Sequence, residues 1–247
     1  MSEQPNPPKF THKDFIQDPL WTAVDDFAMS HCHPPSRRPN ASILTQTLLR
    51  SKAAGLPDIS ASPAQAKFMA LHCRLQKVTH ALEVGTLGGY TAIWLASENP
   101  SLKLVTVEHN PSFAAVAREN IALAGLSDRI EVIEGKGLDV LDQLQEEVLV
   151  GKRERFGFTF IDADKPNNYN YFCLAMEMAV PKSVICIDNV VRGGRIVDLE
   201  VCAVDEKVKG GRDAIELVGK DLRVDSVVVQ TVGEKSYDGA LWAVLNE

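Results

Sequence analysis

The chain has no long apolar run, few aromatic residues and fewer basic than acidic side chains. Of its 247 residues, 6% are aromatic, and 33 Asp and Glu against 26 Lys and Arg give a formal net charge of −7. No run approaches the length of a membrane-spanning helix. An acidic chain also lacks the concentrated positive field that binds nucleic acids or anionic membranes. We therefore expect no membrane and no nucleic-acid partner, which leaves small molecules as the expected ligands.

Paired cysteines and a signal segment are missing as well. The five cysteines form no C-x-x-C motif and are odd in number, so a disulfide framework is not expected and a reducing compartment is favoured. The first nine residues are polar and proline-rich rather than apolar, unlike a secretory signal. We expect a cytoplasmic protein in which residues 1–18 form a loose tail.

The rest of the chain, residues 19–247, is expected to be one domain. A hydrophobic content of 45% can bury one substantial core, and nothing in the composition separates two halves. Residues 19–77 show helical periodicity, interrupted by proline-rich breaks at 31–39 and 57–63. Ser62 and Pro63 suit a helix start. This pattern predicts an N-terminal helical extension in front of a core at residues 78–247.

Within the core, short apolar runs alternate with amphipathic stretches, which predicts βαβ units and a largely parallel sheet with helices on both faces. Expected strands are 80–84, 103–107, 130–133, 158–161 and 184–187, and expected helices are 90–97, 111–124, 138–148, 169–179, 196–207 and 212–218. Two further strand-like runs, 224–230 and 240–245, follow one another, with Gly233 and Asp238-Gly239 between them. This ending predicts an antiparallel hairpin.

Two polar clusters each follow a predicted strand. Asp162, Asp164 and Lys165 come after the run 156–161, and Asp188 and Asn189 come after 184–187. Both should lie at the carboxyl edge of the sheet, where open α/β sheets bind ligands. Oxygen ligands from two strand ends suit a hard divalent cation, and a nearby lysine suits proton transfer or substrate placement. Taken singly, an Asp-Asn pair also fits a turn or helix cap, and Lys165 also fits a solvated surface lysine.

A glycine-containing turn joins the first core strand to the first core helix. Gly85, Gly88 and Gly89 would let a ligand approach the backbone, and the helix that follows offers unpaired N–H groups. The spacing is not G-x-G-x-x-G, and Glu83 would repel a phosphate. Glu108, about twenty residues further along, can accept hydrogen bonds from ribose hydroxyls. The pattern suits a positively charged adenosine compound such as S-adenosylmethionine, although the loop alone also fits an ordinary strand-to-helix turn.

In their order along the chain, these motifs resemble those of the cation-dependent class I O-methyltransferases, which include caffeoyl-CoA and catechol O-methyltransferases. The matching residues are Leu82-Glu83-Val84-Gly85, Gly89-Tyr90-Thr91, Glu108, Asp162-Ala163-Asp164-Lys165, Asp188-Asn189 and Asp238-Gly239. The resemblance implies a Rossmann-like, doubly wound α/β fold with a seven-stranded, mostly parallel sheet whose last strand is antiparallel. It also implies S-adenosylmethionine as methyl donor, Mg²⁺ or another divalent cation such as Ca²⁺ or Mn²⁺, a phenolic acceptor with adjacent hydroxyls, and a homodimer.

The resemblance also assigns roles to individual residues. It gives the cation to Asp162, Asp188 and Asn189, and the phenolic proton to Lys165, which also contacts the acceptor. It leaves Asp164 to orient Lys165 or to cap the next helix. The implied donor contacts are Glu83, Gly85, Thr91, Glu108, Gly137 and Asp162, with Ile59 and Ser60 bordering the donor site.

One residue departs from the family pattern. Plant caffeoyl-CoA enzymes usually have tryptophan near the position of Arg192. An arginine there could hold an acidic acceptor or form a salt bridge elsewhere. Coenzyme A thioester substrates are therefore less expected.

The leading hypothesis is methyl transfer from S-adenosylmethionine to one hydroxyl of a catechol-like small molecule that is chelated by a divalent cation. An NAD-type oxidoreductase is disfavoured by the glycine spacing and by Glu83. A non-catalytic protein that binds S-adenosylmethionine or a protein partner is disfavoured because Asp162, Lys165, Asp188 and Asn189 are all present. The acidic balance disfavours a nucleic-acid methyltransferase.

Overall fold

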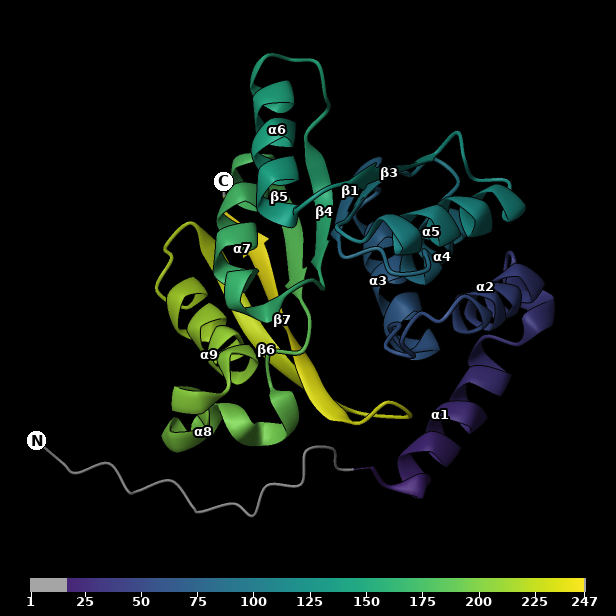
Figure 1. Ribbon diagram of the computed structural model, residues 1–247, viewed down its shortest axis with the longest axis horizontal. Helices are drawn as coiled ribbons and strands as arrows, with labels where there is room; N and C mark the ends of the chain where they lie inside the picture. Colours follow the sequence, from purple (N-terminus) through teal and green to yellow (C-terminus); the bar gives the residue numbers. More distant parts are fainter. Residues whose placement is uncertain (1–16, 247) are drawn as a thin grey trace, which may run out of the picture.

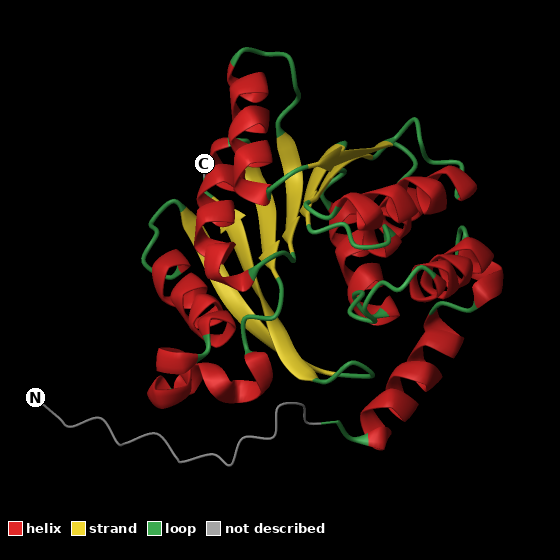
Figure 2. Cartoon of the chain, in the orientation of Figure 1, coloured by secondary structure: helices red, strands yellow, loops and turns green. Residues whose placement is uncertain are grey.

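A seven-stranded sheet forms the centre of the computed structural model, which describes residues 17–246 (Figures 1 and 2). The strand order is β3-β2-β1-β4-β5-β7-β6. The first five strands in this order, β3, β2, β1, β4 and β5, pair in parallel with one another. β7 is antiparallel to both of its neighbours, β5 and β6. The predicted sheet with an antiparallel last strand is confirmed. The strands are β1 (His80–Val84), β2 (Lys103–Glu108), β3 (Ile130–Glu134), β4 (Phe156–Ile161), β5 (Ala179–Ile187), β6 (Val224–Val232) and β7 (Tyr237–Leu245).

Among the described residues, three α-helices precede the sheet, in the segment where periodicity predicted a helical extension. They are α1 (Pro19–Cys32), α2 (Ala41–Ala53) and α3 (Pro63–Leu75), with a short 3-10 helix, η1 (Pro35–Arg37), in the first proline-rich break. Each side-chain cap there satisfies a backbone N–H that the helix leaves open. Asp18 accepts from the N–H of Leu20, and Ser62 accepts from that of Gln65. Most of the predicted tail, residues 1–16, lies outside the described residues.

Alternate side chains of the strands enter two separate apolar layers. Leu104 and Phe160 face one layer with α3 and α4 (Tyr90–Glu98), whereas Val105 and Ile161 face the other, with α6 (Gly137–Leu149) and α7 (Asn168–Glu177). This period of two is what a sheet covered on both faces requires. α5 (Pro111–Leu123) packs beside β2 and β3, and α9 (Glu206–Val218) packs beside α7.

The chain reverses its direction of sheet growth between β1 and β4. After β1 it builds outward to β2 and β3, and it then returns so that β4 pairs with the opposite side of β1. Such a switch point opens a crevice at the carboxyl ends of the two central strands. The glycine turn follows β1 there, and Asp162 follows β4.

Three predicted boundaries were wrong for local reasons. The expected helix 196–207 is divided into η3 (Arg192–Val197), α8 (Leu199–Val204) and the start of α9, because Asp198 and Asp205 each cap a new helix. The expected helix 169–179 ends at Glu177, and β5 already begins at Ala179. Asp238-Gly239 lies inside β7 rather than in the hairpin turn, since Gly239 pairs with Gln230 of β6.

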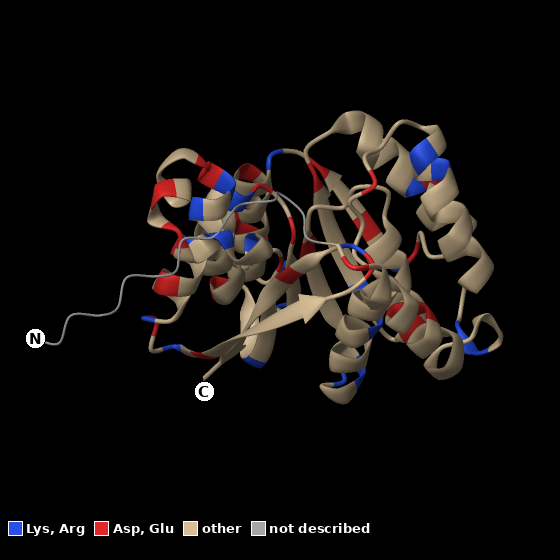
Figure 3. Cartoon of the chain, turned by 90° about the horizontal axis from the view of Figure 1, so that it is seen from below, with Lys and Arg blue, Asp and Glu red and all other residues tan. Residues whose placement is uncertain are grey.

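Charged residues are spread over the helices. Figure 3 shows basic and acidic positions interspersed there, while most of the strand surface carries neither. No helix within residues 17–246 has both the length and the apolarity needed to cross a membrane.

Candidate active site

The turn after β1 is pressed directly against the backbone that carries Asp162. Gly85 has a φ of +106°, and a Cβ built on it would lie 2.3 Å from the carbonyl oxygen of Asp162. Two hydrogen bonds fix this approach, from Gly85 N–H to the Val107 carbonyl (2.9 Å) and from Asp162 N–H to the Val84 carbonyl (2.8 Å). Only glycine fits here. The predicted donor loop and the first predicted cation ligand are therefore one rigid unit.

Glu108 is held in place by the turn that it faces. Its carboxylate accepts hydrogen bonds from the N–H groups of Leu87 and Asn110, each at 2.9 Å. A carboxylate oxygen has two lone pairs, so each of these oxygens can accept one further donor. The arrangement suits the predicted contact with two ribose hydroxyls.

Glu83 lies beneath the turn and is almost fully enclosed, with 1% of its surface exposed. Thr106 donates to it at 2.6 Å, and the Thr106 hydroxyl also contacts the hydroxyl of Thr86 at 2.6 Å. Burial raises the pKa of Glu83 to about 8, and the negative charges of Asp162 and Glu108 act in the same direction. The predicted contact of Glu83 with the donor stays a prediction.

Among the described residues, the N-terminus of α4 has no side-chain cap for its first N–H groups. Its cap residue is Gly89, in the left-handed region with a φ of +81°, and no side chain of the described residues closes this end. Thr91 lies in the first turn and is buried. An uncapped helix start with a hydroxyl beside it suits a carboxylate, which agrees with the predicted role of Thr91.

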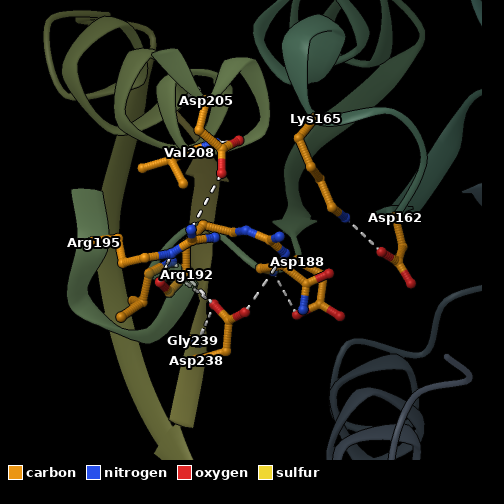
Figure 4. Close-up of polar contacts among 11 residues, drawn as sticks. Asp162, Lys165, Asp188, Arg192, Arg195, Asp205, Val208, Asp238 and Gly239 are labelled. Atoms are coloured by element: carbon orange, nitrogen blue, oxygen red, sulfur yellow. Dashed lines mark hydrogen bonds and ion pairs between the residues drawn. The ribbon is translucent and has the colours of Figure 1, made fainter. Parts of the chain in front are cut away.

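The two polar clusters meet at the carboxyl ends of β4 and β5. Figure 4 shows Asp162 and Lys165 facing one another with Asp188 nearby. The Lys165 Nζ donates to Asp162 Oδ1 at 2.6 Å, and the Asp188 N–H donates to the Ile161 carbonyl at 2.9 Å. Asn189 has a φ of +54°, a region that asparagine tolerates better than most residues. All four predicted catalytic side chains thus come from adjoining strand ends.

The electrostatics of this cluster fit a bound cation. Burial raises the pKa of Asp188, the charge of Asp162 raises it further, and Lys165 opposes both effects. Two carboxylates brought together with one ammonium leave net negative charge in a partly buried site, which a hard cation with oxygen ligands would neutralise. Within residues 17–246, no three His, Cys, Asp or Glu side chains are grouped to hold a metal. The candidate ligand set therefore depends on the Asn189 amide.

Asp164 contacts the segment that leads into α7. Its carboxylate accepts from the side chains of Asn167 and Tyr171, and its carbonyl accepts from the Asn167 N–H at 3.1 Å. The Asp164 side chain accepts no backbone N–H at the start of the 3-10 helix η2 (Lys165–Asn167), and the residue at the start of α7 is Asn167. Both roles left open for Asp164 stay predictions. Tyr171 also packs on Gly137, where a Cβ would lie 2.7 Å from its ring.

Gln65 is a site residue that the sequence did not indicate. A hydrogen bond from its side chain lowers the pKa of Asp188, so α3 of the N-terminal extension reaches the ligand cluster. The Ser62-x-x-Gln65 spacing is typical of a capping box, and Ser62 does cap α3. Because this spacing already gives Gln65 a local role, the sequence did not indicate its contact with Asp188. The predicted donor contacts Ile59 and Ser60 lie in the preceding loop, where Ile59 is exposed, and their role stays a prediction.

Comparison with known proteins decides the family. A model of the O-methyltransferase family matches residues 38–235. The chain belongs to the O-methyltransferase family. This confirms the resemblance recognised from the motifs, and it removes the alternative of an NAD-type oxidoreductase.

Several O-methyltransferases are similar to the chain over nearly its whole length. The O-methyltransferase imqG of Aspergillus flavus is 55% identical over 236 residues, 96% of this chain and 95% of that protein. The catechol O-methyltransferase of Mycobacterium tuberculosis is 36% identical over 246 residues, 99% of each chain. The crystal structure of the O-methyltransferase from Bacillus cereus in complex with SAH is 41% identical, with a TM-score of 0.85 covering 92% of this chain and 99% of that one.

Proposed function

We propose that the protein transfers a methyl group from S-adenosylmethionine to one hydroxyl of a vicinal-dihydroxy aromatic molecule, with a divalent cation at Asp162, Asp188 and Asn189. The observation that carries this proposal is the contact of the glycine turn with Asp162. It supports the proposal because an adenosine donor bound at the turn would lie beside a cation and diol bound at Asp162. A structural relative bound to SAH supports the donor, and a catechol O-methyltransferase among the relatives supports the acceptor.

The donor would be held by groups that complement its charges. The uncapped start of α4 and Thr91 face its carboxylate, and Glu108 accepts from its ribose hydroxyls.

In the proposed step, a phenolate oxygen of the acceptor attacks the methyl carbon in line with the C–S bond. The O–CH₃ bond forms as the S–CH₃ bond breaks, and the sulfonium becomes the neutral thioether of S-adenosylhomocysteine. A cation held at Asp162, Asp188 and Asn189 would stabilise the phenolate form of the bound diol. Lys165 is the group of the chain that steers the phenolic proton, because its buried Nζ lies 2.6 Å from Asp162 at the same edge.

Labelled methyl transfer to matched dihydroxybenzenes tests this function. Catechol should be methylated, whereas resorcinol, whose hydroxyls are not adjacent, should react far more slowly because it cannot chelate through both oxygens. EDTA should abolish turnover and added Mg²⁺ should restore it. Full activity in EDTA would contradict the cation assignment. Donor binding without methylation of any diol would instead favour a non-catalytic S-adenosylmethionine-binding protein.

A further inference from the structure

Arg192 is a buried cation beside the ligand cluster. It lies three residues after Asn189, and 18% of its side chain is exposed. Its Nε is buried without a hydrogen-bond partner, and its ion pair with Asp238 Oδ2 is long, at 4.0 Å. Buried polar groups in native proteins are nearly always hydrogen-bonded, so an unpartnered Nε needs an explanation.

Asp238 fixes the position of Arg192 without satisfying its guanidinium. Asp238 Oδ1 accepts three backbone N–H groups, from Val191 at 3.1 Å, Arg192 at 2.8 Å and Gly239 at 2.9 Å. The Val190 N–H also donates to the Gly239 carbonyl, at 3.0 Å. β7 therefore holds the backbone that follows the cation ligands, and only Asp238 Oδ2 is left to face Arg192.

The neighbouring cations are better satisfied. Lys165 donates to Asp162 at 2.6 Å, and Arg195 pairs with Asp205 at 3.2 Å. Arg192 differs from them because its ion pair with Asp238, at 4.0 Å, is at the outer limit of contact. Asp205 is a second acidic neighbour, since the charge of Arg192 helps to lower the pKa of Asp205. In the view of Figure 4, Asp188 lies between the Arg192–Asp238 pair and the Asp162–Lys165 pair. Because Arg192 follows the predicted ligand Asn189 by only three residues, its guanidinium is a permanent charge on the segment that leaves the cluster.

We propose that Arg192 binds a carboxylate on the aromatic acceptor, so that the preferred substrate is a vicinal-dihydroxy aromatic acid. This inference rests on the proposed function. A guanidinium presents its donors in a planar fork that matches a carboxylate, and such paired bonds are stronger than bonds between neutral groups. Without Arg192, an acidic acceptor would be close to the carboxylates of Asp162, Asp188 and Asp238, with the ammonium of Lys165 as the basic group beside them.

The test uses two acceptors that differ in one charge, 3,4-dihydroxybenzoate and its methyl ester. Wild type should have the higher kcat/KM for the acid. In Arg192→Met the acid-to-ester ratio of kcat/KM should fall by about 10- to 100-fold, mainly through the KM for the acid. Arg192→Lys should fall in between, because it keeps the charge but loses the fork. Arg118→Met, which removes an exposed arginine of α5, should leave the ratio unchanged.

Equilibrium binding separates the possible failures. Calorimetry of the acid should show weaker binding to Arg192→Met than to wild type, with ester binding unchanged, whether or not either molecule is methylated. Wild type that binds the acid through Arg192 but methylates neither acceptor would contradict the proposed function alone. An unchanged acid-to-ester ratio in both Arg192 variants would overturn the assignment of Arg192. Equal losses for acid and ester would overturn it too, because they would show a purely structural role.

Discussion

Glu83 is a buried carboxyl group whose ionisation links stability to pH. Its carboxyl ionises near pH 4.5 when free but near pH 8 in the fold. A raised folded pKa means that its contribution is complete below about pH 4.5 and is lost as the pH rises through about 8. Burial with few hydrogen bonds is the cause, since Thr106 is its one side-chain donor.

Glu83→Gln should therefore make the protein less sensitive to alkaline pH. An amide oxygen can still accept from Thr106, and it carries no charge that must be buried. Without ligands, the Tm of the variant should exceed that of wild type by a few degrees near pH 9, and the difference should shrink near pH 5. Scanning calorimetry across this range measures it. Glu134→Gln, at the exposed end of β3, is the control. A parallel shift of Tm at every pH would contradict the account.

At the scale of elements, the site depends on the contact between the turn after β1 and the end of β4. Gly85→Ala would place a Cβ 2.3 Å from the Asp162 carbonyl oxygen, at a φ of +106°. We expect a loss of roughly 1–3 kcal/mol of stability from strain and clash, together with weaker binding of donor.

Gly151→Ala is the matched control for that prediction. Gly151 also has a positive φ, +73°, but a Cβ there would meet nothing within 4 Å. It should cost less stability and leave donor affinity unchanged. Chemical denaturation and calorimetry with S-adenosylhomocysteine measure both quantities. Equal effects of the two substitutions would show that the contact with Asp162 is not important.

The elements that sequence predicts well are those set by local pattern. The strand His80–Val84 and the cap Ser62 were predicted correctly, because periodicity and capping act over a few residues. Asp198 and Asp205 divide an expected helix. Each accepts backbone N–H groups at the start of a new helix, and the apolar periodicity alone did not indicate these breaks. Contacts between residues far apart in the sequence could not be predicted from periodicity or capping.

The candidate site shows the same division between local and distant information. The strand-end clusters indicated Asp162 and Asp188 because parallel strands bring their carboxyl ends together. Gln65 from α3 reaches the same cluster from far along the chain. Nothing in its own neighbourhood distinguished it from a residue at a helix start.

At the scale of the molecule, segments from both halves of the chain meet at the tip of the β6–β7 hairpin. The Glu234 N–H donates to Asp25 of α1 at 2.9 Å, and Lys235 pairs with Asp58 at 2.8 Å. Figure 1 shows the hairpin reaching toward α1. The N-terminal helices are thereby connected to the sheet edge that carries the site, as the contact of Gln65 with Asp188 also indicates.

An exposed apolar stripe on α1 is relevant to the expected homodimer. Three apolar side chains there are more than half exposed, and they are spaced along one stripe of the helix: Leu20, Val24 and Phe27. An apolar stripe of this kind is what a second subunit would cover. The homodimer stays a prediction.

The central claim is that Asp162, Asp188 and Asn189 bind the cation, whereas the donor is bound by groups that do not include Asp188. Mn²⁺ binding, followed by electron paramagnetic resonance in wild type and in Asp188→Ala, tests it most directly, with S-adenosylhomocysteine binding measured on the same samples. We expect the variant to lose bound Mn²⁺ and to keep S-adenosylhomocysteine affinity within about threefold. Unchanged Mn²⁺ binding in Asp188→Ala, or loss of both ligands together, would contradict the account.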